Sequence, residues 1–127
     1  MKIEIEVFDE VKKALSNLSE EAKSRLLSAL EAYVKFTGLN PARLIEEAKA
    51  DKLKSNPEYV SEERLYTFLG HLLTEQKVDQ KLALSHFNDI RSFYAKNGVS
   101  LNVSIPRALR YAKYTLGVHV EGIDWLG

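Results

Sequence analysis

Residues 61–73 read SEERLYTFLGHLL, and this segment indicates the kind of fold more clearly than any other part of the chain. Its apolar residues recur at intervals of three and four, which is the period of an α-helix with one buried face. Ser61 followed by two glutamates is typical of a helix start, because the hydroxyl accepts a main-chain N–H and the acids complement the helix dipole. The expected buried side consists of Leu65, Phe68, Leu69, Leu72 and Leu73.

Start and stop signals mark further helices on both sides of this segment. Serine, asparagine and aspartate cap helix starts, proline suits the first helical position, and glycine ends helices in a left-handed conformation. These signals bound helices at Ser19 to Gly38, Asn40-Pro41 to Ala48, Asp79 to Asn97-Gly98, and Ser104 with Pro106 to Gly117. The sequence therefore predicts a mainly α fold, a bundle of four to five helices.

The first eight residues follow a different pattern, in which charged and apolar side chains alternate. Ile3, Ile5 and Val7 fall on one side of this pattern, which predicts a short, half-buried strand. Val118 and Val120 alternate in the same way near the other end, so the strand is expected to pair either with them or with a second subunit.

The chain divides into three parts on these signals. Residues 1–18 are expected to form the N-terminal strand and a short helix that starts at Asp9, residues 19–117 the helical domain, and residues 118–127 a tail. The polar segment from Asp51 to Tyr59 reads as a loop inside the domain, because neither side of it has enough apolar residues to fold separately.

Length and composition narrow the class of protein. A chain of 127 residues suits one domain, and 45% hydrophobic with 28% charged residues is ordinary globular usage. The absence of cysteine excludes disulfides, thiolate metal ligands and a cysteine nucleophile. No apolar run resembles a signal peptide or a membrane span. We therefore expect a soluble, cytoplasmic protein with no membrane partner.

The net charge is zero, with 18 basic and 18 acidic side chains, but the charges are unevenly distributed. Residues 1–80 hold 12 basic and 15 acidic side chains, and residues 118–127 add two acids. Residues 81–117 hold six basic side chains against the single acid Asp89. One segment therefore carries the positive field of the protein, as expected of a surface that binds a polyanion.

The helix predicted after Asp79 carries most of the candidate DNA-binding residues. At about 100° per residue, the side opposite Phe87 and Ile90 is small, polar and basic. Such a face fits a recognition helix, because short side chains let the helix enter the major groove and lysines at both ends reach phosphates. A solvated helix face explains the same pattern. The candidates are Lys81, Ser85, Asn88, Arg91, Ser92 and Lys96.

The last predicted helix adds three cations at intervals of three residues, which places them on a shared side. They are Arg107, Arg110 and Lys113. Together they are suited to hold a phosphate strand, although helix solubilisation and pairing with acids elsewhere explain them equally well.

The sequence offers no complete set of catalytic or metal-binding residues. His71, His86 and His119 are far apart along the chain and have no cysteine or close histidine partner, so the spacing of a metal site is absent. There is no nucleophile elbow and no glycine-rich phosphate loop. We expect no metal, no cofactor and no enzymatic activity.

Two segments resemble the core-binding domain of archaeal-type tyrosine recombinases, the phage-integrase family. The first is AYVKFTGLNP at residues 32–41, followed by LIEEA at 44–48. The second is LSHFNDIRSFYAKNGV at residues 84–99, preceded by the helix at 65–73. The resemblance covers about residues 20 to 107 and preserves order and spacing across several helices.

The resemblance implies a SAM-like helical bundle that grips duplex DNA while a separate domain cuts it. The cutting domain of that family carries a His-x-x-Arg motif and a tyrosine nucleophile. Three positions after His71, His86 and His119 the residues are Thr74, Asp89 and Gly122, so this motif is absent here. The expected partners are therefore double-stranded DNA and, through the terminal strand or tail, a recombinase or a second copy.

A protein-interaction domain is the alternative function. Such a domain keeps the helical fold, has lost the basic surface, and uses the terminal strand or the tail around Trp125 to bind a partner or itself. Surface charge separates the two functions. Basic residues gathered on a face without acids favour DNA, and basic residues paired with Glu and Asp favour protein interaction.

Overall fold

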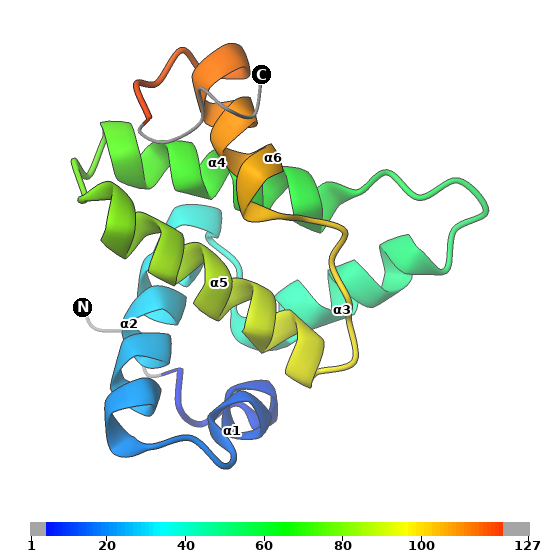
Figure 1. Cartoon of the computed structure of the whole chain (residues 1–127). Helices are drawn as coiled ribbons and strands as arrows, with labels where there is room; N and C mark the ends of the chain where they lie inside the picture. Colours follow the sequence, from blue (N-terminus) through cyan, green and yellow to red (C-terminus); the bar gives the residue numbers. More distant parts are fainter. Residues whose placement is uncertain (1–4, 121–127) are drawn as a thin grey trace.

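The computed structural model describes residues 5–120, and this part of the chain is mainly helical, as predicted (Figure 1). The elements are α1 (Asp9–Leu15), α2 (Glu20–Thr37), α3 (Pro41–Lys52), α4 (Val60–Thr74), α5 (Gln80–Lys96), α6 (Ile105–Arg110) and a π-helical turn, η1 (Tyr111–Thr115). None of these helices is long and apolar enough to cross a membrane.

The structure corrects the predicted N-terminal strand where it is described. Residues 5–8 form a turn, in which the N–H of Phe8 donates to the carbonyl of Ile5 at 3.2 Å, and the chain then enters α1. Ile5 is buried as the alternation requires, but Val7, on the same predicted face, is 64% exposed. The remainder of the predicted strand, residues 1–4, lies outside the described residues.

The predicted strand partner near the other end is not a strand either. The N–H of Val118 donates to the carbonyl of Ala112 at 2.8 Å, which ends the η1 turn. Val120 is buried in a small apolar cluster with Leu109 and Ala112. The last described residues therefore fold back onto α6 and η1. The rest of the tail, with Trp125, lies outside the described residues.

α5 is the central helix and packs against α1, α2 and α4 (Figure 1). At the middle of the core, the rings of Tyr33 on α2 and Phe68 on α4 meet edge to face, with centroids 4.9 Å apart. The hydroxyl of Tyr33 lies 3.4 Å from that of Tyr94 on α5. Burial raises the pKa of both phenols, so both stay protonated and share a hydrogen bond inside the core.

Three of the predicted caps are confirmed by hydrogen bonds. The side-chain oxygens accept main-chain N–H groups three residues ahead, which satisfies donors that a helix start leaves unpaired. The pairs are Ser19 with Ala22 at 3.1 Å, Asn40 with Arg43 at 2.9 Å, and Ser104 with Arg107 at 3.3 Å.

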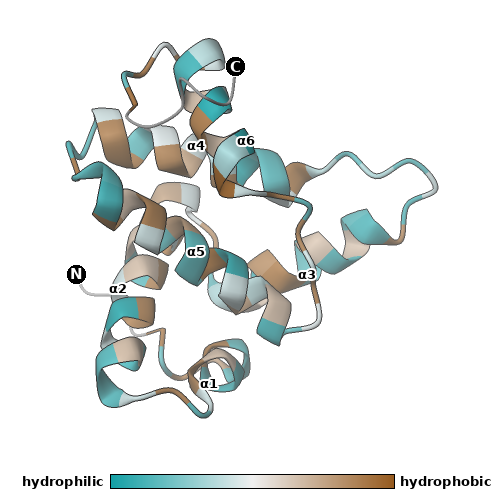
Figure 2. Ribbon diagram, in the orientation of Figure 1, coloured by the Kyte–Doolittle hydropathy of each residue, from teal (hydrophilic) through white to brown (hydrophobic). Residues whose placement is uncertain are grey.

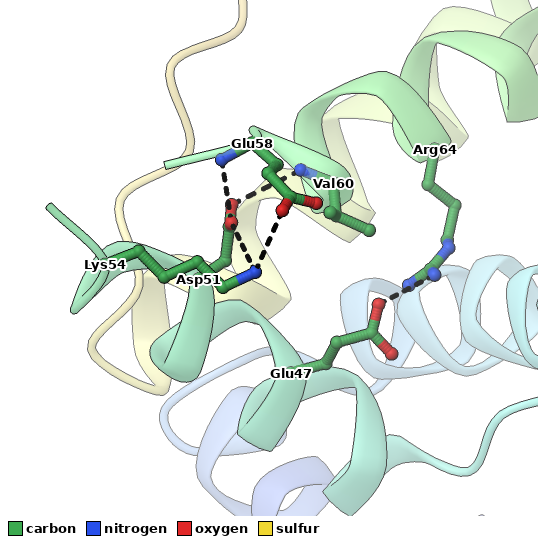
Figure 3. Close-up of polar contacts among 6 residues, drawn as sticks. All are labelled: Glu47, Asp51, Lys54, Glu58, Val60 and Arg64. Carbon is green, nitrogen blue, oxygen red and sulfur yellow. Dashed lines mark hydrogen bonds and ion pairs between the residues drawn. The ribbon is translucent and has the colours of Figure 1, made fainter. Parts of the chain in front are cut away.

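The start of α4 differs from the prediction, because a residue of the preceding helix caps it. α4 begins at Val60, and Ser61 is buried in its first turn. The carboxylate of Asp51, at the end of α3, accepts the N–H of Glu58 at 2.9 Å and that of Val60 at 3.3 Å (Figure 3). These bonds, above all the one from Glu58, hold the pKa of Asp51 below its usual value. Asp51 therefore closes the α3–α4 loop, which extends from the bundle in Figure 1.

A second buried carboxylate positions the segment that leads to α6. Glu62 on α4 accepts from the ammonium of Lys52 at 2.7 Å and from the main-chain N–H of Asn102 at 3.0 Å. The second contact joins α4 to a residue 40 positions further along the chain. Glu62 thus fixes where the chain approaches α6, and with it the position of the α6 cations.

Candidate nucleic-acid interface

α5 presents one side to the core and another to the surface, and its ribbon alternates between hydrophobic and hydrophilic segments (Figure 2). Phe87 and Ile90 are fully buried, which confirms the predicted inner face. On the outer side, Lys81 and Ser92 are exposed, whereas Ser85, Asn88 and Arg91 are half-buried. The polar face is therefore present but narrower than the helical pattern alone suggests.

The polar face of α5 is narrow because neighbouring side chains of the helix pack against other elements. Leu84 lies beside Ser85 on α5 and packs against the apolar cluster formed by Leu109, Ala112 and Val120. Asn88, one turn further along, has its Oδ1 shielded from solvent and without a hydrogen-bond partner. Recognition of adenine by an asparagine needs both the oxygen and the nitrogen of the amide. In this conformation, Asn88 does not present both atoms to a base edge.

Lys96, at the C-terminal end of α5, is engaged within the protein. Its ammonium donates to the carbonyls of Ala14 and Ser16, each at 3.2 Å, and so caps the end of α1. The neighbouring Asn97 donates to the carbonyl of Glu10 at 2.9 Å. An ammonium has three N–H bonds, so Lys96 keeps one donor for a further acceptor.

The same end of α5 borders a shallow depression that the sequence pattern does not predict. Its lining includes Lys12 and Lys13 of α1 together with Lys96, Ser16 and Asn17. The adjacent Lys12 and Lys13 lie within residues 1–80, whose net charge is negative. The distribution of charge along the chain therefore does not indicate a basic site there. The two adjacent lysines at the end of a short predicted helix were the only local signal.

α6 and η1 place their three cations differently. Arg107 is exposed, and its guanidinium donates to the side-chain oxygen of Asn102 at 3.4 Å. Arg110 is also exposed. Lys113 is half-buried, with its ammonium 5.4 Å from the centre of the Tyr114 ring. Leu84 of α5 packs against Leu109 of α6 and Ala112 of η1, so the elements that carry this second set of cations lie next to α5.

The salt bridges among residues 5–120 lie in the segment with a net negative charge, residues 1–80. Residues 5–120 contain salt bridges from Lys23, Lys52, Lys54 and Arg64 to nearby carboxylates. None of these pairs involves a cation of α5 or α6. The single acid of the basic segment, Asp89, is half-buried on α5, and burial raises its pKa. The electrostatic partners of Asp89 are Arg25 and His86, which oppose this rise.

His71 and His86 line one cavity, and His119 lies outside it. His71 contacts Phe36 in a tilted arrangement with ring centroids 4.8 Å apart, and His86 lies on α5 three residues before Asp89. His119 is exposed near the end of the described chain. Among residues 5–120, no group of three histidine, cysteine, aspartate or glutamate side chains is arranged to hold a metal ion.

Comparison with known proteins found no matching family model, no matching curated protein and no matching solved structure.

Proposed function

We propose that this chain is a module that binds duplex DNA without cutting it, and that its helices form a SAM-like bundle as in the core-binding domains it resembles. The proposed contact surface consists of the cations of α5, α6 and η1. The observation that carries the proposal is that Lys81, Arg91, Arg107 and Arg110 have no salt bridge within residues 5–120. Cations without acid partners are available to neutralise phosphates.

The length of α5 suits this role. Lys81 and Lys96 are 15 residues apart, which corresponds to about 22 Å along a helix at 1.5 Å per residue. The major groove is about 12 Å wide, so a helix that crosses it with these ends can reach the phosphate strand on each side. Lys96 contributes its remaining donor, and Lys12 and Lys13 extend the positive surface at that end.

Ser85, Asn88 and Arg91 are half-buried, which favours contacts to DNA phosphates over contacts to base edges. Phosphate contacts supply affinity and register but little sequence preference. We therefore expect binding with a strong dependence on salt and a weak dependence on sequence.

A titration of a short labelled duplex with the full chain, repeated at several salt concentrations, tests the proposal. Four to six phosphate contacts predict that the logarithm of the binding constant falls with the logarithm of salt with a slope of roughly −4 to −5. A chain that binds no duplex at low salt, or binds with no salt dependence, contradicts the proposal. The protein-interaction alternative then takes its place and predicts self-association in sedimentation.

A further inference from the structure

A cavity of about 480 Å³ lies between α2, α4 and the first half of α5. This volume falls within the range of about 300–1,000 Å³ that is usual for small-molecule sites. The apolar part of its wall is formed by side chains such as Phe36, Phe68 and Leu72. None of the proposed DNA-contacting residues lines it.

Three aromatic rings, those of Phe36, Phe68 and His71, pack against one another along one wall of the cavity. The Phe36 ring lies 5.5 Å from that of Phe68 and 4.8 Å from the imidazole of His71, centroid to centroid. Both pairs are tilted, with interplanar angles of 46° and 35°. Such a wall favours a flat aromatic occupant, because rings gain from offset and edge contacts beyond the area they bury.

The polar side of the cavity is suited to a negative charge. Lys35 is the one formally charged residue in the lining, it is exposed, and the lining contains no carboxylate. Among residues 5–120, no salt bridge involves Lys35. Its ammonium is therefore available to an anionic group at the cavity.

His86 supplies a neutral donor to the same cavity. Burial lowers the pKa of His86, against a smaller opposing effect of Asp89, so the imidazole is neutral at pH 7. Its Nδ1 is shielded from solvent and has no hydrogen-bond partner. A proton on that nitrogen would be buried and unpaired, which favours the tautomer with the proton on Nε2. In this tautomer, Nε2 carries the N–H of the imidazole.

We propose that this cavity binds a small aromatic carboxylate, with its ring against Phe36 and its carboxylate between Lys35 and His86. The proposal does not depend on DNA binding, and it shares no residue with that surface.

Isothermal titration of the full chain with 2-naphthoate tests this proposal, with 2-naphthamide as the neutral analogue of the same shape. The wild type is expected to bind the acid more tightly than the amide. Lys35→Gln should weaken binding of the acid by about three- to fivefold, as loss of a solvent-exposed ion pair predicts, and leave binding of the amide unchanged. Lys49→Gln, at an exposed lysine of α3 outside the cavity, is the matched control and should change neither.

A second variant tests the location independently of charge. Ser28→Phe places a ring in the lining from an exposed position of α2, and should abolish binding of both compounds while the unfolding midpoint stays near that of the wild type. Amide NMR shifts on adding 2-naphthoate should concentrate at residues 28–36 and 68–78. Absence of binding at millimolar acid, equal effects of Lys35→Gln and Lys49→Gln, or shifts located elsewhere would each overturn the proposal.

Discussion

The ammonium of Lys96 lies 3.2 Å from the main-chain carbonyl of Ala14, and this contact joins residues 82 positions apart in the chain. It ties the C-terminal end of the central helix to the end of α1. A cation at a helix C-terminus also interacts favourably with the negative end of the helix dipole. The contact therefore stabilises α1 in two ways. The same residue belongs to the proposed DNA surface, so its two roles must be separated by experiment.

Replacing Lys96 with Met should lower the free energy of unfolding by about 1 kcal/mol, since two hydrogen bonds to carbonyls and a favourable dipole contact are lost. Lys96→Arg keeps the charge and should lose less. Urea denaturation of both variants measures the difference. If Lys96→Met unfolds at the wild-type midpoint, the capping contact contributes nothing to stability.

The buried face of α5 gives a second prediction. Ile90→Ala should destabilise the protein by roughly 2–5 kcal/mol, because Ile90 is fully buried and truncation leaves a cavity in the core. Ser92→Ala, on the exposed side of the same helix, is the control and should change stability little. Equal midpoints for the two variants would show that the inner and outer faces are wrongly assigned.

Asp51 makes stability depend on pH. Its pKa in the folded protein lies below the ordinary value of 3.8, chiefly because its carboxylate accepts the N–H of Glu58. The carboxylate therefore stabilises the fold above the unfolded pKa, and this contribution is lost as the pH falls through the lower folded pKa.

Asp51→Asn should accordingly be less stable than the wild type at pH 7. The two proteins should converge in stability as the pH falls from about 5 to below the folded pKa of Asp51. Urea midpoints measured across this range provide the comparison. A constant gap between the two proteins at every pH would contradict a role for the charge.

Gly70 on α4 leaves room for the side chain of Leu116, the residue that follows η1. A Cβ placed at residue 70 would overlap Cδ1 of Leu116, just beyond η1. Gly70→Ala raises helix propensity by about 1 kcal/mol but forces Leu116 to move. We predict faster hydrogen exchange at residues 111–117 in Gly70→Ala than in the wild type. Leu116→Ala removes the overlap, so adding Gly70→Ala to Leu116→Ala should leave hydrogen exchange unchanged. An equal increase in exchange when Gly70→Ala is added to the wild type and to Leu116→Ala would contradict the contact.

Local signals in the sequence were sufficient to predict much of the helical framework. Ser19, Asn40 and Ser104 cap through residues three positions away, so their roles are visible in a short window. The predicted N-terminal strand is not confirmed in its described part, residues 5–8. Alternation over a few residues fits a strand, yet a turn between residues 5 and 8 buries Ile5 while it exposes Val7.

The candidate site was less predictable because its details depend on tertiary contacts. The helical period predicts Asn88 on the outer side of α5, but Asn88 is half-buried, and the shielding of its Oδ1 comes from packing that the period does not encode. The contact of Lys96 with Ala14 and the cap that Asp51 gives to α4 also join different helices. Sequence spacing alone carries no signal for these contacts.

The salt dependence of duplex binding, compared between the wild type and the variant Lys81→Ala/Arg107→Ala/Arg110→Ala, tests the proposed DNA surface most directly. These three residues are exposed and form no salt bridge among residues 5–120, so their loss should leave stability near that of the wild type. Arg43→Ala/Lys49→Ala, at exposed cations of α3, is the control. We predict that the triple variant binds more weakly, with a salt slope smaller by about three, while the control binds as the wild type does. Identical slopes for the triple variant and the wild type would contradict it.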